Sequence, residues 1–296
     1  MKRLIITIAI LVAAMSGLKI SAQGMHEFSV YGGGGLSTLN YKLSVGNASK
    51  GFGGDLGFGY TYLFSTVRVV ETGTVSHKQW GIHTGIGFGF YNANTKLNDG
   101  VKTITSYLRD NEGDRFILHT KLSAYNETQN TVFLNIPAMA QFQAGQFYAL
   151  GGIKMGIPLS SKYNSKEVAL SNEAYYPEFK NWAETQTFAG YGSFKDKNYD
   201  GTIDLGIAMM LALEAGMNFD LSNNFSLYGG VYFDYGLNNI ATSERLEFIN
   251  YSSKSPEEFN ANSVLSSYTD NSKSYTFTDK VNIMAVGIKV RLALKK

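Results

Sequence analysis

Hydrophobic and polar residues alternate with a period of two in short segments that recur along the chain. In residues 225–239 (FSLYGGVYFDYGLNN), Phe225, Val231 and Phe233 fall on one face of a strand and Asp234 falls on the other. A period of two is typical of β-strands that have one apolar face. The alternation predicts eight strands, over residues 28–38, 52–62, 80–91, 132–143, 147–157, 203–219, 225–239 and 281–292.

The connections between these segments alternate in length. Short turns, AGQ and DLSNN, join the fourth segment to the fifth and the sixth to the seventh, whereas the connections after the third, fifth and seventh are long and rich in Asn, Ser, Thr and Tyr. This alternation is typical of transmembrane β-barrels, which have short periplasmic turns and long extracellular loops. We therefore predict an all-β fold, an antiparallel up-and-down transmembrane barrel of eight strands. Its long extracellular loops would lie at 94–130, 160–202 and 238–279.

Two features of the sequence leave alternatives open for the type and number of the predicted strands. Residues 203–219 are apolar enough for a helix, although Gly206, Gly216 and the neighbouring pattern favour a strand. The connection from the second to the third segment is long where a short turn is expected. Ten strands are therefore the alternative if residues 66–79 or 94–130 form a further hairpin.

The N-terminus is typical of a signal peptide. Lys2 and Arg3 precede an apolar run over 4–15, and a small-residue segment ends at Ala22. We expect cleavage after Ala22, or slightly later after Gly24. An N-terminal membrane anchor is the alternative, but the apolar run is shorter than the ~20 residues that span a bilayer.

No linker-like boundary follows the signal peptide, so we expect residues 1–22 to be removed and 23–296 to form one outer-membrane β-barrel domain. Export removes Lys2, Arg3 and Lys19 and leaves 23 basic residues against 24 acidic ones. A mature chain so close to neutral gives no support for nucleic-acid binding. The absence of cysteine excludes a disulfide scaffold, thiolate metal sites and thiol catalysis.

The faces opposite the apolar ones carry glycine and about one ionisable residue per strand. In a lipid-embedded barrel such faces line the lumen, whereas in a soluble β-sandwich, the alternative, they would form the solvated outer surface. Aromatic residues near strand ends favour the barrel, because they suit an interfacial girdle. These aromatic residues are Tyr60, Tyr62, Trp80, Phe219 and Phe225.

The lumen is accordingly predicted to hold a charge network. It comprises Asp55, Lys154, Glu214, Asp234, Lys289 and Arg291, with His83 as a further polar group. An unpaired charge in a narrow lumen is costly, so Asp234 and Glu214 should pair with some of the three cations.

Five motifs together resemble the OmpA-like outer-membrane β-barrel proteins, especially those of Bacteroides-type bacteria. They are FSVYGGGGLSTLNY, IHTGIGFGFY, LNIPAMAQFQ, YALGGIKMGIPL and SLYGGVYFDYGLNN. The resemblance implies an outer-membrane location in a Gram-negative envelope, contact with outer-membrane lipid and insertion by the barrel-assembly machinery. The C-terminal segment resembles the assembly signal at Gly287, Val290 and Leu292 but ends in ALKK instead of an aromatic residue.

One motif, DKNYDGTID at residues 196–204, suggests a cation site. Asp196, Asn198 and Asp200 precede Gly201 with the spacing of a calcium loop, and Asp204 lies at position 9. The twelfth position, which is Glu in helical calcium loops, is apolar here. A plain Asp-Gly turn explains the same residues. Calcium in an extracellular loop is thus one prediction, and no other cofactor is expected.

The remaining features favour a non-enzymatic role. The four histidines, at positions 26, 77, 83 and 119, are scattered and belong to no nucleophile or acid–base motif. Aromatic residues cluster in one long connection, and they suit either self-packing or a surface for an unknown extracellular partner. They are Tyr175, Tyr176, Phe179, Trp182, Tyr191 and Phe194.

An eight-stranded barrel is just wide enough to be filled by side chains. We therefore predict a structural or surface-interaction protein, with a small porin-like channel or ligand-uptake barrel as the alternative.

Overall fold

The structure is a computed structural model that describes residues 24–64, 67–71, 74–97, 103–242, 245–252, 255, 258–268 and 276–296. The signal peptide predicted at 1–22 lies outside these residues. The described chain is mostly strand, with irregular connections and one 3₁₀ turn, η1 (Thr187–Ala189). No helix in these ranges has the length and apolar character needed to cross a membrane.

Eight antiparallel strands form a closed ring. They are β1 (Met25–Tyr41), β3 (Phe52–Leu63), β5 (Thr74–Leu97), β7 (Arg115–Ala144), β8 (Phe147–Tyr176), β11 (Ala208–Asp220), β12 (Phe225–Gly236) and β17 (Val281–Lys295). Each strand pairs with the ring strands before and after it in the chain, and β17 pairs with β1 to close the ring. The predicted all-β antiparallel fold and its eight principal segments are therefore confirmed. The helix considered for 203–219 does not form, because most of that segment is β11.

The prediction of eight strands holds for the ring alone, because shorter strands lie outside it. Five pair with ring strands: β2 (Asn47–Lys50), β4 (Val67–Glu71), β6 (Ile104–Arg109), β9 (Asn181–Ala183) and β10 (Gly192–Thr202). Four form two small ribbons: β13 (Leu246–Glu247) with β16 (Ser267–Tyr268), and β14 (Ile249–Asn250) with β15 (Asn260–Ala261). Both hairpins considered for a ten-stranded barrel do form, through β4 and β6. They extend β5 and β7 without entering the ring.

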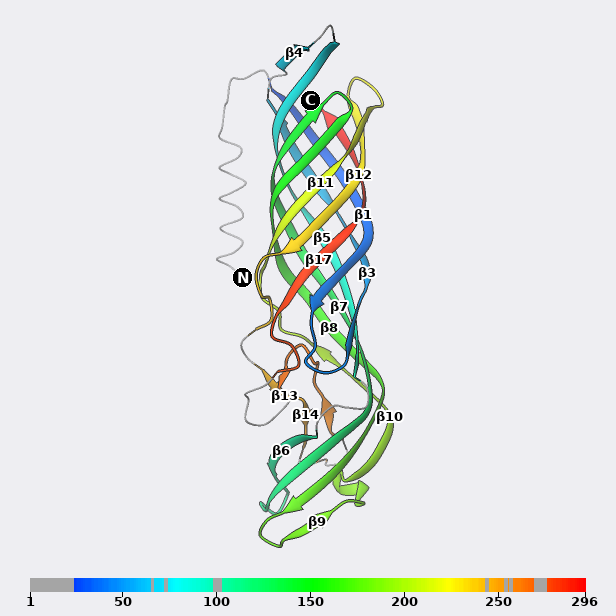
Figure 1. Cartoon of the computed structure of the whole chain (residues 1–296), viewed down its shortest axis with the longest axis vertical. Helices are drawn as coiled ribbons and strands as arrows, with labels where there is room; N and C mark the ends of the chain where they lie inside the picture. The colour runs from blue at the N-terminus through cyan, green and yellow to red at the C-terminus, as the bar shows by residue number, and fades with distance from the viewer. Residues whose placement is uncertain are drawn as a thin grey trace.

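The predicted loops at 94–130 and 160–202 are wrong for most of their residues, which continue as strand. β7 and β8 each run for 30 residues and pair almost throughout. Their far halves leave the ring and, with β6, β9 and β10, build a long extension at the end opposite the C-terminus (Figure 1). The turns β7–β8 and β11–β12 lie at the C-terminal end of the ring (Figure 1).

The described residues of the connection from β12 to β17 (237–242, 245–252, 255, 258–268 and 276–280) are mostly irregular and cover the mouth of the ring; we call them the mouth segment. Its apolar side chains share one core with Tyr125, Tyr163 and Tyr199 of the extension. The buried ones are Ile240, Phe248, Ile249, Phe259, Val264, Leu265 and Phe277. The loop predicted at 238–279 is therefore present, but it packs inward and covers the mouth.

Candidate functional site: the charged interior of the ring

The ring strands point apolar side chains outward and polar or small ones inward. Along β11, Met209, Leu211 and Leu213 are exposed, whereas Met210, Ala212 and Glu214 alternate with them and are buried. A strand places successive side chains on opposite faces, so this alternation puts the charged residues inside the ring.

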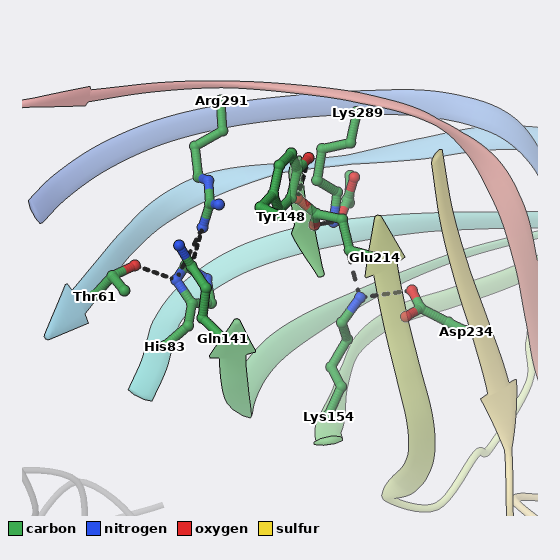
Figure 2. A network of polar contacts seen from close by, with 10 residues as sticks. Thr61, His83, Gln141, Tyr148, Lys154, Glu214, Asp234, Lys289 and Arg291 are labelled. Carbon is green, nitrogen blue, oxygen red and sulfur yellow. Dashed lines mark hydrogen bonds and ion pairs between the residues drawn. The ribbon is translucent and has the colours of Figure 1, made fainter. Parts of the chain in front are cut away.

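Five charged side chains from five different strands meet in the interior (Figure 2). Lys154 Nζ lies 2.5 Å from Asp234 Oδ2 and 4.0 Å from Asp55 Oδ2. Lys289 Nζ lies 2.7 Å from Asp55 Oδ2 and 3.6 Å from Glu214 Oε2. All five side chains are buried. Each carboxylate therefore has a cation beside it, as a narrow low-dielectric interior requires.

Tyrosine side chains complete this network. Tyr148 donates its hydroxyl to Glu214 Oε1 at 2.9 Å. Lys289 Nζ lies 4.6 Å from the ring centroid of Tyr232 and 5.0 Å from that of Tyr31. An ammonium group over an aromatic face is attracted by the ring quadrupole. The tyrosines therefore support the ion pairs as well as filling space.

Arg291 borders the same cavity as the ion pairs but takes part in none of them, and its direct contacts are with aromatic and polar side chains. Its guanidinium carbon is 4.2 Å from the ring centroid of Tyr228. Its Nη1 donates to His83 Nδ1 at 3.2 Å and to Gln141 Oε1 at 3.4 Å (Figure 2). His83 Nδ1 also lies 2.8 Å from Thr61 Oγ1. Among the described residues no carboxylate lies within ion-pair distance of Arg291. Five of the six predicted network residues thus meet directly, and Arg291 does not join them.

Glu27 and the four interior tyrosines were missing from the predicted network. Tyr228 Oη lies 2.9 Å from both carboxylate oxygens of Glu27 and accepts a hydrogen bond from Gln143 Nε2 at 2.8 Å. These residues occupy the same inward parity as the predicted ones. Their inward-facing strand positions could have identified them, but tyrosine is also common in the aromatic girdle of a lipid-facing surface.

Gly33 on β1 lies between two network residues that belong to the strands on either side of β1. It lies directly opposite Asp55 on β3 and Lys289 on β17. A Cβ at this position would come within 2.6 Å of Asp55 Oδ1 and 3.2 Å of Tyr232 Cε1. Glycine therefore lets the Asp55 and Lys289 side chains meet above the intervening β1.

We expect Gly33→Ala to lower the free energy of unfolding by about 1–3 kcal/mol, because overpacking would displace Asp55 from Lys289. Urea unfolding followed by gel mobility measures the loss. Gly32→Ala is the matched control, since its Cβ would meet nothing closer than 4.0 Å. Equal stability of the two variants would contradict this account of Gly33.

The interior leaves very little free space. The cavity bordered by Lys154, Glu214, Asp234, Lys289 and Arg291 measures about 20 Å³, room for about one water molecule. The described interior is thus closely packed around its charges.

The predicted calcium residues occupy a strand instead of a loop. Asp196, Asn198 and Asp200 lie on β10, which pairs with β8, and Asp204 follows the end of that strand. All four are exposed, and Asn198 Oδ1 accepts a hydrogen bond from the backbone N–H of Glu167 at 3.4 Å. In the ranges that the structure describes, no group of three or more acidic or histidine side chains could hold a metal ion. Calcium binding stays a prediction, without preformed ligands in the described chain.

The aromatic residues predicted as either self-packed or partner-facing differ in their burial. Tyr191 is buried against Phe116, and Phe194 packs against Phe259 with ring centroids 5.0 Å apart. Phe179 and Trp182 are exposed. Trp182 nevertheless packs against Tyr175, and Phe179 against Tyr176, with ring centroids 4.9 and 6.3 Å apart, so the exposed members also contact the cluster.

Comparison with known proteins gives no relative from which function could be transferred: no family model matches the sequence, and a search of curated proteins finds no similar sequence.

Proposed function

We propose that the chain is an outer-membrane β-barrel protein of the OmpA-like type with a structural or surface-interaction role. The ring of eight strands is its transmembrane barrel, and its outer face contacts outer-membrane lipid after insertion by the barrel-assembly machinery. The extension and the mouth segment lie outside the cell, where they meet an extracellular partner. The lumen stays filled by side chains.

The observation that carries this proposal is the largely apolar outer surface around a charged interior. Seven of the eight ring strands contribute large exposed apolar side chains; among them are Phe28, Phe58, Ile82, Phe147, Ile153, Leu211, Val231 and Ile288. On β7 the outward-facing Val132, Leu134, Ile136 and Phe142 are half-buried. An apolar surface of this extent is unfavourable in water and is the surface that a lipid-embedded barrel presents. Trp80, Phe147, Phe219 and Phe225 lie near the short turns, where an interfacial girdle belongs.

The packed interior favours a structural or interaction role over a porin-like channel. The charged cluster leaves room for about one water molecule, and the mouth segment covers the other end of the interior.

Two measurements on the mature protein test the proposal. We expect it to remain in the outer-membrane fraction and to change mobility on a denaturing gel after boiling, as folded barrels do. In planar bilayers the purified protein should give no steady conductance. Recovery as a soluble periplasmic species would refute the membrane location. Reproducible open channels would favour the porin-like alternative.

A further inference from the structure

Three neighbouring strands change from apolar to polar on their outward faces where they approach the extension. Along β5 the outward side chains are Phe88 and Phe90 and then Asn92. Nine outward positions of β5, β7 and β8 follow this change, none of them is buried, and we call them the polar belt: Asn92, Asn94, Lys96, Asn126, Thr128, Asn130, Lys162, Asn164 and Lys166. Two of these strands, β7 and β8, continue from the ring into the extension (Figure 1). The belt therefore lies at the base of the extension, directly beyond the apolar face of the ring.

The change occurs at the same level on adjacent strands. Phe90 pairs directly with Val132, and the next outward pair is Asn92 with Asn130. Asn130 in turn pairs with Lys162 of β8. Directly paired residues point to the same face of a sheet, so the last apolar row and the first polar row run straight across the strands. A level boundary of this kind is typical of a surface that passes from the hydrocarbon to the polar region of a membrane.

The polar belt is confined to one side of the ring. On β11 and β12 the outward side chains stay apolar up to the strand ends that face the mouth, where Ile207 and Leu237 are exposed. These two strands stop there, whereas β5, β7 and β8 run on. The polar belt is therefore a local surface of one wall and not a general property of the strand ends.

Amide and hydroxyl groups make up most of the belt. Thr128 Oγ1 donates to Asn94 Oδ1 at 2.9 Å across β5 and β7. Across the described residues, the side-chain amides of Asn130 and Asn164 have no hydrogen-bond partner. A side-chain amide offers two donor hydrogens and an acceptor oxygen. The belt therefore presents hydrogen-bonding groups, at the regular spacing of a sheet, to a ligand that carries many hydroxyls.

The charges on this surface are nearly balanced. The belt lysines have no carboxylate within 4.0 Å among the described residues; they are Lys96, Lys162 and Lys166. Two acids, Glu167 and Asp200, border the belt on its β10 side. Glu167 Oε2 accepts a hydrogen bond from Asn126 Nδ2 at 3.4 Å, and Asp200 pairs with Asn164. Because these acids offset much of the positive charge, an anion alone gains little here, and a ligand has to use the amides as well.

We propose that the polar belt binds the head group of a phosphorylated glycolipid, an inference that rests on the proposed function because the apolar face of the ring must lie in lipid. Sugar hydroxyls hydrogen-bond to the belt amides, and phosphate groups bind the lysines. The acyl chains lie along the apolar rows that begin at Phe90 and Val132. Lys162 and Lys166 are four residues apart on one strand, which separates their Cα atoms by roughly 13 Å, and Lys96 lies two strands, about 10 Å, from Lys166. These separations suit a head group of one or two sugar rings.

Other ligands would use only part of this surface. An anionic phospholipid without sugar would reach the lysines but leave the belt amides without partners. A soluble acidic saccharide would use the amides and lysines but would gain nothing from the apolar rows beside them. An amphiphile that carries sugar, phosphate and hydrocarbon uses all three parts, because the strands lead directly from the apolar rows into the belt.

The test uses the full mature protein in detergent micelles and measures bound lipid by native mass spectrometry. The probe is lipopolysaccharide reduced to its acyl chains and innermost sugars. The comparison ligands are its phosphatase-treated form, phosphatidylglycerol and the delipidated head-group oligosaccharide. We expect the probe to bind about tenfold more tightly than phosphatidylglycerol, and removal of its phosphates or acyl chains to abolish most of that preference.

Variants locate the site. Lys96→Gln/Lys162→Gln/Lys166→Gln should bind the probe about tenfold more weakly, and Asn130→Leu/Asn164→Leu should reduce the preference for the probe over phosphatidylglycerol. The matched control, with the same change in net charge on exposed lysines of the extension outside the belt, is Lys121→Gln/Lys180→Gln/Lys195→Gln. Its affinity should be unchanged. Gel mobility before and after boiling checks that each variant is folded.

Three results would each overturn the inference: equal affinity of the two triple variants, phosphatidylglycerol bound as tightly as the probe, or the free oligosaccharide bound as tightly as the probe. A membrane-inserted protein without preference for the glycolipid would refute this inference alone. Recovery of the protein as a soluble species would refute the proposed function itself, and the inference with it.

Discussion

Replacing Asp234 by leucine is expected to lower the free energy of unfolding by about 3 kcal/mol, because it leaves the buried ammonium of Lys154 without its closest partner. The Lys154–Asp234 contact is 2.5 Å, and the next carboxylate, Asp55, is 4.0 Å away and already pairs with Lys289. Urea unfolding of the protein in vesicles, followed by the mobility shift between folded and unfolded bands, measures the change.

The double variant Asp234→Leu/Lys154→Met is the informative control. It removes both charges, so it should recover much of the stability lost in Asp234→Leu, as replacement of a buried pair by apolar residues often does. A single variant as stable as the parent would mean that water compensates the cation, and the interior would then be wetter than its 20 Å³ cavity indicates.

Replacing Glu127 by leucine is expected to release the mouth segment, with a loss of about 3 kcal/mol in the local free energy of opening. The Glu127 carboxylate accepts hydrogen bonds from Ser263 Oγ at 2.5 Å and from the backbone N–H of Val264 at 3.1 Å. It also accepts from Tyr125 Oη at 2.5 Å and Gln129 Nε2 at 2.7 Å. Burial raises the pKa of the Glu127 carboxyl, and its hydrogen bonds oppose that rise.

Limited proteolysis detects this release. Cleavage within residues 246–268 should accelerate in Glu127→Leu while the ring keeps its boiling-dependent mobility. Glu127→Gln retains one acceptor oxygen and should lie between parent and Glu127→Leu. Glu173→Leu, an exposed acid on the same extension, serves as the control and should cleave like the parent. Unchanged cleavage in Glu127→Leu would show that apolar packing alone holds the mouth segment.

The ring strands were predictable because every second side chain, on the outward face, is apolar, which gives a strong alternating pattern. The far halves of β7 and β8 lack that signal. In the stretch Thr128 to Thr131, the buried positions Gln129 and Thr131 are as polar as the exposed ones beside them. Polar alternation cannot be distinguished from loop composition in the sequence alone, so strands were predicted as loops there.

The site was predictable only to the level of which residues face inward. Asp55 and Lys289 come from strands that are not adjacent, and they meet because Gly33 lies between them on β1. That contact depends on the register of three strands, which the alternation does not define. For the same reason Arg291 could not be separated in advance from the other cations. The calcium motif was predicted in a loop because the spacing of its residues carries no information about the pairing of β10 with β8.

The β7–β8 hairpin, whose two strands are continuous although their register shifts at three places, has a mechanical consequence. Thirty residues of strand have a contour length of roughly 100 Å, whereas a tilted strand crosses a bilayer in about 9–11 residues. In a membrane-embedded molecule most of this hairpin is therefore a stalk, continuous with the wall that anchors it and without a hinge of flexible chain between the two. The number of residues in β7 and β8 then determines the height of the tip above the lipid. A force applied to the tip acts directly on the backbone hydrogen bonds of the ring.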